Sequence, residues 1–155
     1  MLLEKKELAS KVEEELRKLS FEVRILQGEA EALQSRINMV NAVISDITYA
    51  NMTLDGLGKR KGDAELLVPI GGSSYIKAKL QDPDKVVVGM GAGVSVEKTL
   101  QESKGIVKKR LEDLEKTMVS LEQRFRQVAQ RINEDRAKLE ELAAELRKGK
   151  PSRNV

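Results

Sequence analysis

Apolar residues recur in alternating steps of three and four along two long stretches of the chain. In the first stretch they are Val12, Leu16, Leu19, Val23, Leu26, Ala30, Leu33, Ile37, Val40, Ile44 and Ile47. In the second stretch they are Val107, Leu111, Leu114, Met118, Leu121, Phe125, Val128 and Ile132, followed by Leu139, Leu142 and Leu146. Steps that average 3.5 residues are typical of helices that wind left-handed around a partner. The pattern predicts two long helices that fold back on each other as an antiparallel coiled coil.

Between these stretches, apolar residues recur at every second position, which is the period of a β-strand. They are Leu66, Val68 and Ile70, then Ile76, Ala78 and Leu80, then Val86, Val88, Met90 and Ala92. Tight turns are expected at Gly71-Gly72, at Asp82-Pro83-Asp84 and at Gly91-Ala92-Gly93, with a fourth strand from Val94 to Glu97. The sequence therefore predicts an α+β chain in which two β-hairpins are inserted between the helices of a coiled coil.

These periods divide the chain into three parts and a tail. We expect an N-terminal coiled-coil helix over residues 1–50, a β-hairpin oligomerisation segment over 51–98 and a C-terminal coiled-coil helix over 99–148. Thr99-Leu100-Gln101-Glu102 has the spacing of a capping box, which predicts that the second helix starts at Thr99. A disordered basic tail is expected over 149–155, because Gly149 and Pro151 end the helix.

The β segment is too small to be stable by itself. Its strands and turns span about 35 residues, below the ~40 at which isolated domains become stable. A two-helix hairpin with one apolar seam covers little of it, and its strand edges are open. We therefore expect other chains to bury its apolar residues. The predicted oligomerisation residues are Leu66, Val68, Ile70, Ile76, Ala78, Leu80, Val86, Val88 and Met90.

Composition narrows the possible functions. Aromatic residues make up 3% of the chain and charged residues 34%, which is typical of long exposed helices. The chain has no cysteine and no histidine, so we expect no disulfide, no thiolate or imidazole catalysis and no zinc site. No stretch approaches the ~20 apolar residues that cross a bilayer. We expect a cytoplasmic protein without a membrane partner.

Signals for nucleotides and nucleic acids are weak. The net charge is +3, but basic and acidic residues are interspersed, so we expect no nucleic-acid partner. The run Gly89 to Gly93 is superficially similar to a dinucleotide-binding loop, but Val94 stands where that pattern needs its last glycine. The sequence therefore indicates no enzyme, no catalytic residues, no cofactor and no metal.

The central segment resembles that of a known family. The similarity lies in Leu67-Val68-Pro69-Ile70-Gly71-Gly72-Ser73-Ser74-Tyr75-Ile76-Lys77-Ala78, Asp82-Pro83-Asp84-Lys85-Val86, Val88-Gly89-Met90-Gly91-Ala92-Gly93 and Val96-Glu97-Lys98. These runs are similar to the two central hairpins of the alpha-class subunit of prefoldin, of the archaeal type. The flanking heptads resemble that family too, so the similarity spans nearly the whole chain.

The resemblance implies an ATP-independent molecular chaperone, a holdase. Two alpha and four beta subunits would join their hairpins into a double β-barrel hub, from which six coiled coils project. Unfolded client polypeptides would be held at the coiled-coil tips and passed to a group II chaperonin.

Residues where the two helices meet at the far end of the coiled coil fit client binding. Leu3 and Leu8 fall off the seam, and Lys5, Ala9 and Asp135 weaken it. The predicted client-binding residues are Leu2, Leu3, Leu8, Val12, Leu139, Leu142 and Leu146.

Several alternatives stay open. The first leucines could be disordered terminal residues, Phe21 and Ile25 could be scattered exposed hydrophobes or cavity-side contacts, and Met39 and Val43 could pack on a neighbouring subunit. Asp135 could fix helix register instead of weakening the tip. The chain could also be a structural spacer or filament former assembled through the same β hub without binding clients. A nucleic-acid-binding coiled coil is a third class, and it requires affinity that falls steeply with salt.

Overall fold

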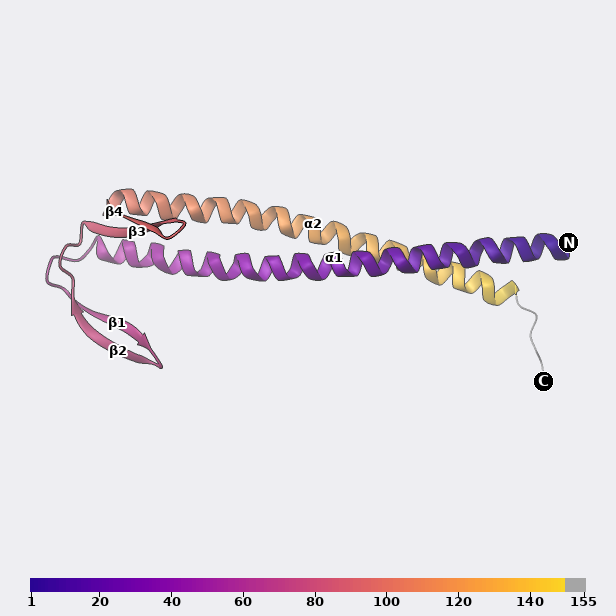
Figure 1. Ribbon diagram of the computed structural model, residues 1–155, viewed down its shortest axis with the longest axis horizontal. Helices are drawn as coiled ribbons and strands as arrows, with labels where there is room; N and C mark the ends of the chain where they lie inside the picture. Colours follow the sequence, from indigo (N-terminus) through magenta and orange to yellow (C-terminus); the bar gives the residue numbers. More distant parts are fainter. Residues whose placement is uncertain (150–155) are drawn as a thin grey trace. The chain divides into compact units, whose positions relative to one another are not determined.

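Along the chain, two small β-hairpins lie between two long helices in the computed structural model, which describes residues 1–149 except for the side chain of Leu2 and the burial of Gly149. The order is α1 (Leu2–Leu57), β1 (Glu65–Gly71), β2 (Ser74–Lys79), β3 (Lys85–Gly91), β4 (Val94–Thr99) and α2 (Leu100–Gly149) (Figure 1). The helix–hairpin–hairpin–helix order is the predicted one. The tail expected over 149–155 lies, from residue 150 on, outside the described residues.

The chain forms two compact units. The first, called the helical unit here, combines residues 1–39 with the chain from 118 on. Its core contains Val23, Leu33, Val128 and Ile132, with Phe125 packed against them. Arg124 pairs with Glu29 at 2.6 Å and Arg131 pairs with Glu22 at 3.0 Å. From the first pair to the second, the residue number rises on α2 and falls on α1. The two segments therefore run antiparallel, as predicted from the heptads.

The second unit, called the hairpin unit, covers residues 40–117. Its core joins the last turns of α1 to the first turns of α2 through Leu54, Leu100 and Val107. Val86 of β3 packs against this core, and Lys104 pairs with Asp55 across it at 3.2 Å. One of the two hairpins is therefore held by the helices.

The first helix ends at Leu57, seven residues beyond the predicted boundary at residue 50. Asn51, Thr53 and Gly56 are weak helix formers, so local preference alone favours an earlier end. In the structure the Thr53 hydroxyl donates to the Tyr49 carbonyl at 2.9 Å, and Leu54 is buried in the core. Tertiary packing therefore outweighs the local preference.

The second helix starts where the capping box predicts. The Thr99 backbone N–H donates to Glu102 Oε2 at 3.0 Å, and the Glu102 N–H donates to Thr99 Oγ1 at 3.2 Å. These bonds satisfy donors that the first helical turn leaves free. The bond from the Thr99 backbone N–H lowers the pKa of the Glu102 carboxyl, with help from the charge of Lys98 and from the Thr99 hydroxyl.

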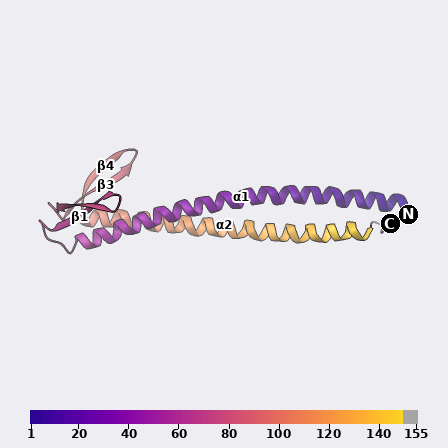
Figure 2. The ribbon, with the colours of Figure 1, turned by 90° about the horizontal axis from the view of Figure 1, so that it is seen from below.

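The two hairpins have the same geometry at an interval of 20 residues. Val68 faces Ile76 in the first hairpin, and Val88 faces Val96 in the second. Each register shifts at the equivalent place, between Pro69 and Gly71 and between Gly89 and Gly91. They form two separate two-stranded sheets, and Figure 2 shows them as separate ribbons. The hairpin insert is thus an internal structural repeat.

The turn of the first hairpin lies one residue beyond the predicted Gly71-Gly72. Gly72 and Ser73 both have φ of +56°, and the equivalent Ala92 and Gly93 have +49° and +76°. Two positive φ angles in a two-residue loop are the geometry of a type I′ turn. Gly71, with φ of +100°, ends β1 beside the irregular pair and is not a turn centre.

Candidate functional site

A partly apolar groove lies where residues 5–13 meet residues 145–148 in the helical unit. Its volume is about 340 Å³. The lining residues are Lys5, Leu8, Ala9, Val12, Glu13, Glu145, Leu146 and Lys148. We call this the distal groove. Three of the predicted client-binding residues, Leu8, Val12 and Leu146, therefore lie together on one surface.

The other predicted client-binding residues differ in their surroundings. Leu3 and Leu8 are largely exposed, Leu8 at 66%, so both offer apolar area to a ligand. Leu142 is half-buried, whereas Leu139 packs against the core of the helical unit and is a seam residue. The side chain of Leu2 lies outside the described part of the chain.

A buried carboxylate lies in the helical unit. Asp135 is 0% exposed, and its Oδ1 accepts no hydrogen bond among the described residues. Arg131 donates from Nε to Asp135 Oδ2 at 3.4 Å and from Nη2 to Glu22 Oε1 at 3.0 Å. The carboxylates of Asp135 and Glu22 raise the pKa of the Arg131 guanidinium. This ionic cluster links α2 to α1 at one level, which favours the register interpretation of Asp135.

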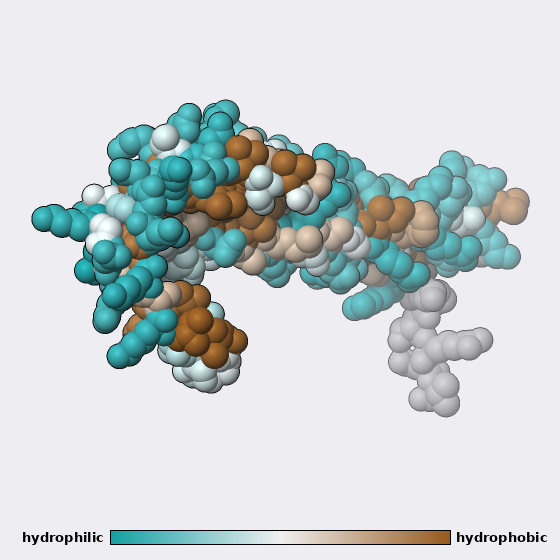
Figure 3. Space-filling model, turned by 60° about the vertical axis from the view of Figure 1, so that its left-hand side comes forward, coloured by the Kyte–Doolittle hydropathy of each residue, from teal (hydrophilic) through white to brown (hydrophobic). Residues whose placement is uncertain are grey.

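The β1–β2 hairpin exposes apolar side chains on both faces. Val68 and Ile76, which pair on one face, are 39% and 51% exposed. Leu67 and Tyr75, on the opposite face, are also exposed. In Figure 3 this hairpin carries a brown, hydrophobic surface. Such a small sheet with two apolar faces fits a surface that other chains cover.

The β3–β4 hairpin differs in its surroundings. Val88 is only 6% exposed and Val86 packs against the core of the hairpin unit, so both are covered by their own chain, and their predicted role in oligomerisation stays a prediction. Arg110 of α2 donates to the Gly89 carbonyl at 2.6 Å and holds the hairpin to the helix. Met90 remains exposed. The period-2 pattern could not separate these roles because it is the same in both hairpins.

Other exposed apolar residues did not stand out in the heptad and strand patterns. Tyr49 and Met52 lie one turn apart near the end of α1 and are 70% and 64% exposed. A signal for them was present, because residues 47–54 contain no charged side chain in a chain that is 34% charged. Exposed positions of a solvated coiled coil are usually charged.

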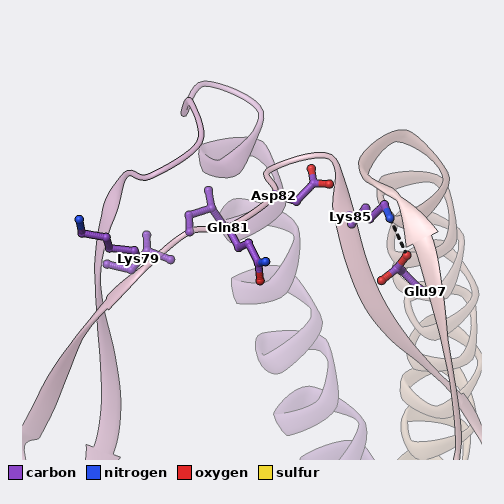
Figure 4. Close-up of a pocket in the computed structure, with 7 residues that line it drawn as sticks. Lys79, Gln81, Asp82, Lys85 and Glu97 are labelled. Atoms are coloured by element: carbon purple, nitrogen blue, oxygen red, sulfur yellow. Dashed lines mark ion pairs between the residues drawn. The ribbon is translucent and has the colours of Figure 1, made fainter.

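A polar cleft of about 630 Å³ lies between the hairpins. Its lining includes Leu66 and Leu80, two predicted oligomerisation residues, together with charged side chains from both hairpins. Figure 4 shows Lys85 and Glu97 pointing toward each other, and their charged groups lie 3.2 Å apart. The cleft is open and lacks a buried titratable group, so its chemistry fits contact with another chain better than catalysis.

Comparison with known proteins matches this architecture to a family. The model of the family described as "Prefoldin subunit" matches residues 26–145, which is most of the chain. The chain belongs to the prefoldin family. This assignment confirms the resemblance inferred from the hairpin residues. Prefoldin alpha subunits are chaperone components that form complexes with other prefoldin subunits.

Similar prefoldins include archaeal alpha subunits. The chain is 37% identical over 120 residues to prefoldin subunit alpha of Methanococcoides burtonii, a match covering 77% of this chain and 87% of that protein. It is 34% identical over 143 residues to the alpha subunit of Methanosarcina mazei, covering 90% and 98%. A cryo-EM structure of filamentous PFD from Methanocaldococcus jannaschii has 29% identity and a TM-score of 0.59, covering 79% of this chain and 96% of that chain. The prefoldin fold is thereby confirmed.

Within the part of this prefoldin chain that the structure describes, neither helix has the length of apolar sequence that a membrane span needs. In the same part of the chain, no three or more carboxylate, imidazole or thiol side chains are grouped so that they could hold a metal ion.

Proposed function

We propose that this prefoldin subunit is part of an ATP-independent holdase that binds unfolded polypeptides in the distal groove. The observation that carries this proposal is the gathering of Leu8, Val12 and Leu146 in one partly apolar groove of a prefoldin chain. Lys5, Glu13, Glu145 and Lys148 surround these side chains with charges of both signs. The groove therefore suits exposed apolar side chains of many sequences without selecting one charge.

Binding in one groove is weak, and the proposed assembly overcomes this. Burial of apolar surface contributes about 25 cal/mol per Å², and part of that is offset by the entropy of ordering a client. Several grooves in one complex raise the effective concentration of the second and later contacts. We assign assembly to the hairpins, in a hetero-hexamer of two alpha and four beta subunits with a β-barrel hub in the cytoplasm, which delivers clients to a group II chaperonin.

Aggregation of a denatured client tests the groove. The assembled complex is expected to suppress light scattering at near-stoichiometric ratios. Leu8→Lys should reduce this protection at least several-fold, because a charge replaces exposed apolar area in the groove. Val119→Lys is the matched control, since Val119 is 61% exposed but lies outside the groove lining. Equal loss in both variants would contradict the proposal.

A second candidate function is a structural filament former that assembles through the same hairpins. It is favoured by the exposed apolar faces of β1–β2 and by the similarity to a prefoldin solved in filamentous form. Electron microscopy of the purified chain distinguishes the two. Filaments that leave client aggregation unchanged would support this function over the holdase.

A further inference from the structure

Asp135 is a poorly compensated charge inside the helical unit. It occupies a seam position between Ile132 and Leu139, where the heptads otherwise place apolar residues. Its side chain is 1% exposed, and Arg131 Nε lies 3.4 Å from each of its two carboxylate oxygens. Charge-assisted hydrogen bonds are typically about 2.7–2.9 Å long, and Oδ1 accepts none among the described residues. The closed helix pair therefore holds a carboxylate that water would solvate better.

The burial of the seam falls beyond Asp135. On its core side, Val128 and Ile132 are buried. We call the segments on its far side, residues 1–19 and 136–149, the distal end, and the described residues of the distal end include no buried side chain. The half-buried seam residues there are Val12, Leu16, Leu19, Leu139, Leu142 and Leu146. Separating the helices at the distal end therefore costs less apolar burial than separating them on the core side.

Arg131 joins the two helices at the boundary of the distal end. It donates to Glu22 on α1 at 3.0 Å. Beyond this pair, the described residues of the distal end form no hydrogen bond or ion pair between α1 and α2, and the pair of Lys18 with Glu14 lies within α1. The side chains of Arg131 and Glu22 are 53% and 45% exposed, so their pair can keep the helix register without closure of the distal end.

We propose that the unsatisfied carboxylate of Asp135 lowers the free energy needed to open the distal end, which makes its half-buried seam residues available to an unfolded client. Opening admits water to Oδ1 and removes a penalty that closure imposes. Val12 and Leu146 then lose each other's cover and join exposed Leu8 as apolar surface. A client that binds the open form gains apparent affinity in proportion to the population of that form. The inference rests on the proposed function, and Asp135 acts in it through the seam without touching the client.

Hydrogen exchange of the assembled complex, followed by mass spectrometry, tests the carboxylate. Asp135→Leu removes the charge and continues the seam, so amides of the distal end should exchange about tenfold more slowly, as expected for one unsatisfied buried group. Glu134→Leu is the matched control, since Glu134 is the neighbouring carboxylate on the exposed side of α2, and its exchange should equal that of the wild type.

Two results of the exchange experiment would overturn the inference. One is equal slowing in Asp135→Leu and Glu134→Leu. The other is a higher midpoint of thermal unfolding in Asp135→Leu with unchanged exchange at the distal end, because the carboxylate would then be relieved only when the whole helical unit unfolds.

Client aggregation separates the opening from the groove itself. Asp135→Leu should reduce protection of a denatured client several-fold, although it keeps every residue that lines the distal groove. Leu8→Lys should reduce protection by changing the groove. Loss of protection in Leu8→Lys with full protection in Asp135→Leu would refute the role of opening and leave the groove standing. Full protection in both variants would refute the proposed function as well.

Discussion

Asp135 places one carboxylate inside the apolar seam of the helical unit. Its side chain is almost fully covered, and Arg131 reaches it from the neighbouring turn while also bonding Glu22 on α1. A buried charge with one oxygen unsatisfied costs free energy. Coiled coils retain such a charge where it fixes the pairing of the helices. The heptad pattern identified this position as an exception, but Arg131 and Glu22 as its partners could be found only in the structure.

Asp135→Leu should stabilise the helical unit. Leucine continues the seam and removes the desolvated carboxylate, while Arg131 keeps Glu22, so we expect a gain of about 1–2 kcal/mol. The midpoint of thermal unfolding, followed by circular dichroism, should rise. Asp113→Leu, at an exposed site paired with Lys109, is the control and should change little. A fall in the midpoint for Asp135→Leu would show that the ionic cluster is required for stability.

At the scale of elements, strict periods made the helices and hairpins predictable. The end of α1 could not be predicted in this way. Buried Leu54 extends the helix through tertiary packing, which local helix propensity does not include. The turn of the first hairpin was placed one residue early, because adjacent glycines both tolerate positive φ and the sequence does not show which pair forms the turn. The different roles of Val68 and Val88 were also hidden, since only contact with the helices separates them.

The start of α2 should give the protein an acid-sensitive element. A lowered pKa means that Glu102 stabilises the fold above its ordinary value of 4.5, and this contribution is lost as the pH falls through the lower value in the folded state. Glu102→Gln keeps an acceptor for the Thr99 N–H but cannot titrate. The unfolding midpoint of this variant should therefore fall less steeply below pH 4.5.

The control for this titration is Glu112→Gln, which changes an exposed carboxylate of α2 outside the capping box. The unfolding midpoint of this variant should fall below pH 4.5 as steeply as that of the wild type. Parallel curves for Glu102→Gln and the wild type would contradict a role of the capping box in acid sensitivity.

For the whole molecule, the two units suggest a division of roles. The hairpin unit carries uncovered apolar strands that suit assembly, and the helical unit carries the distal groove that suits transient apolar contacts. Membership in the prefoldin family gives this division its biological sense, because prefoldin subunits work in complexes. The change of period from 3.5 to 2 predicted where the helices give way to the hairpins, and the division of roles stays a prediction. The groove itself depends on which residues of the two helices meet, and the structure provides that pairing.

Client cross-linking to the assembled complex tests the central claim most directly. A photoactivatable group attached at Leu8→Cys reports on the groove, and the same group at Val119→Cys reports on an equally exposed site elsewhere. After a denatured client is added and the sample is illuminated, adducts should form at Leu8→Cys and stay near background at Val119→Cys. Equal yields at the two sites, or adducts only at Val119→Cys, would contradict client binding in the distal groove.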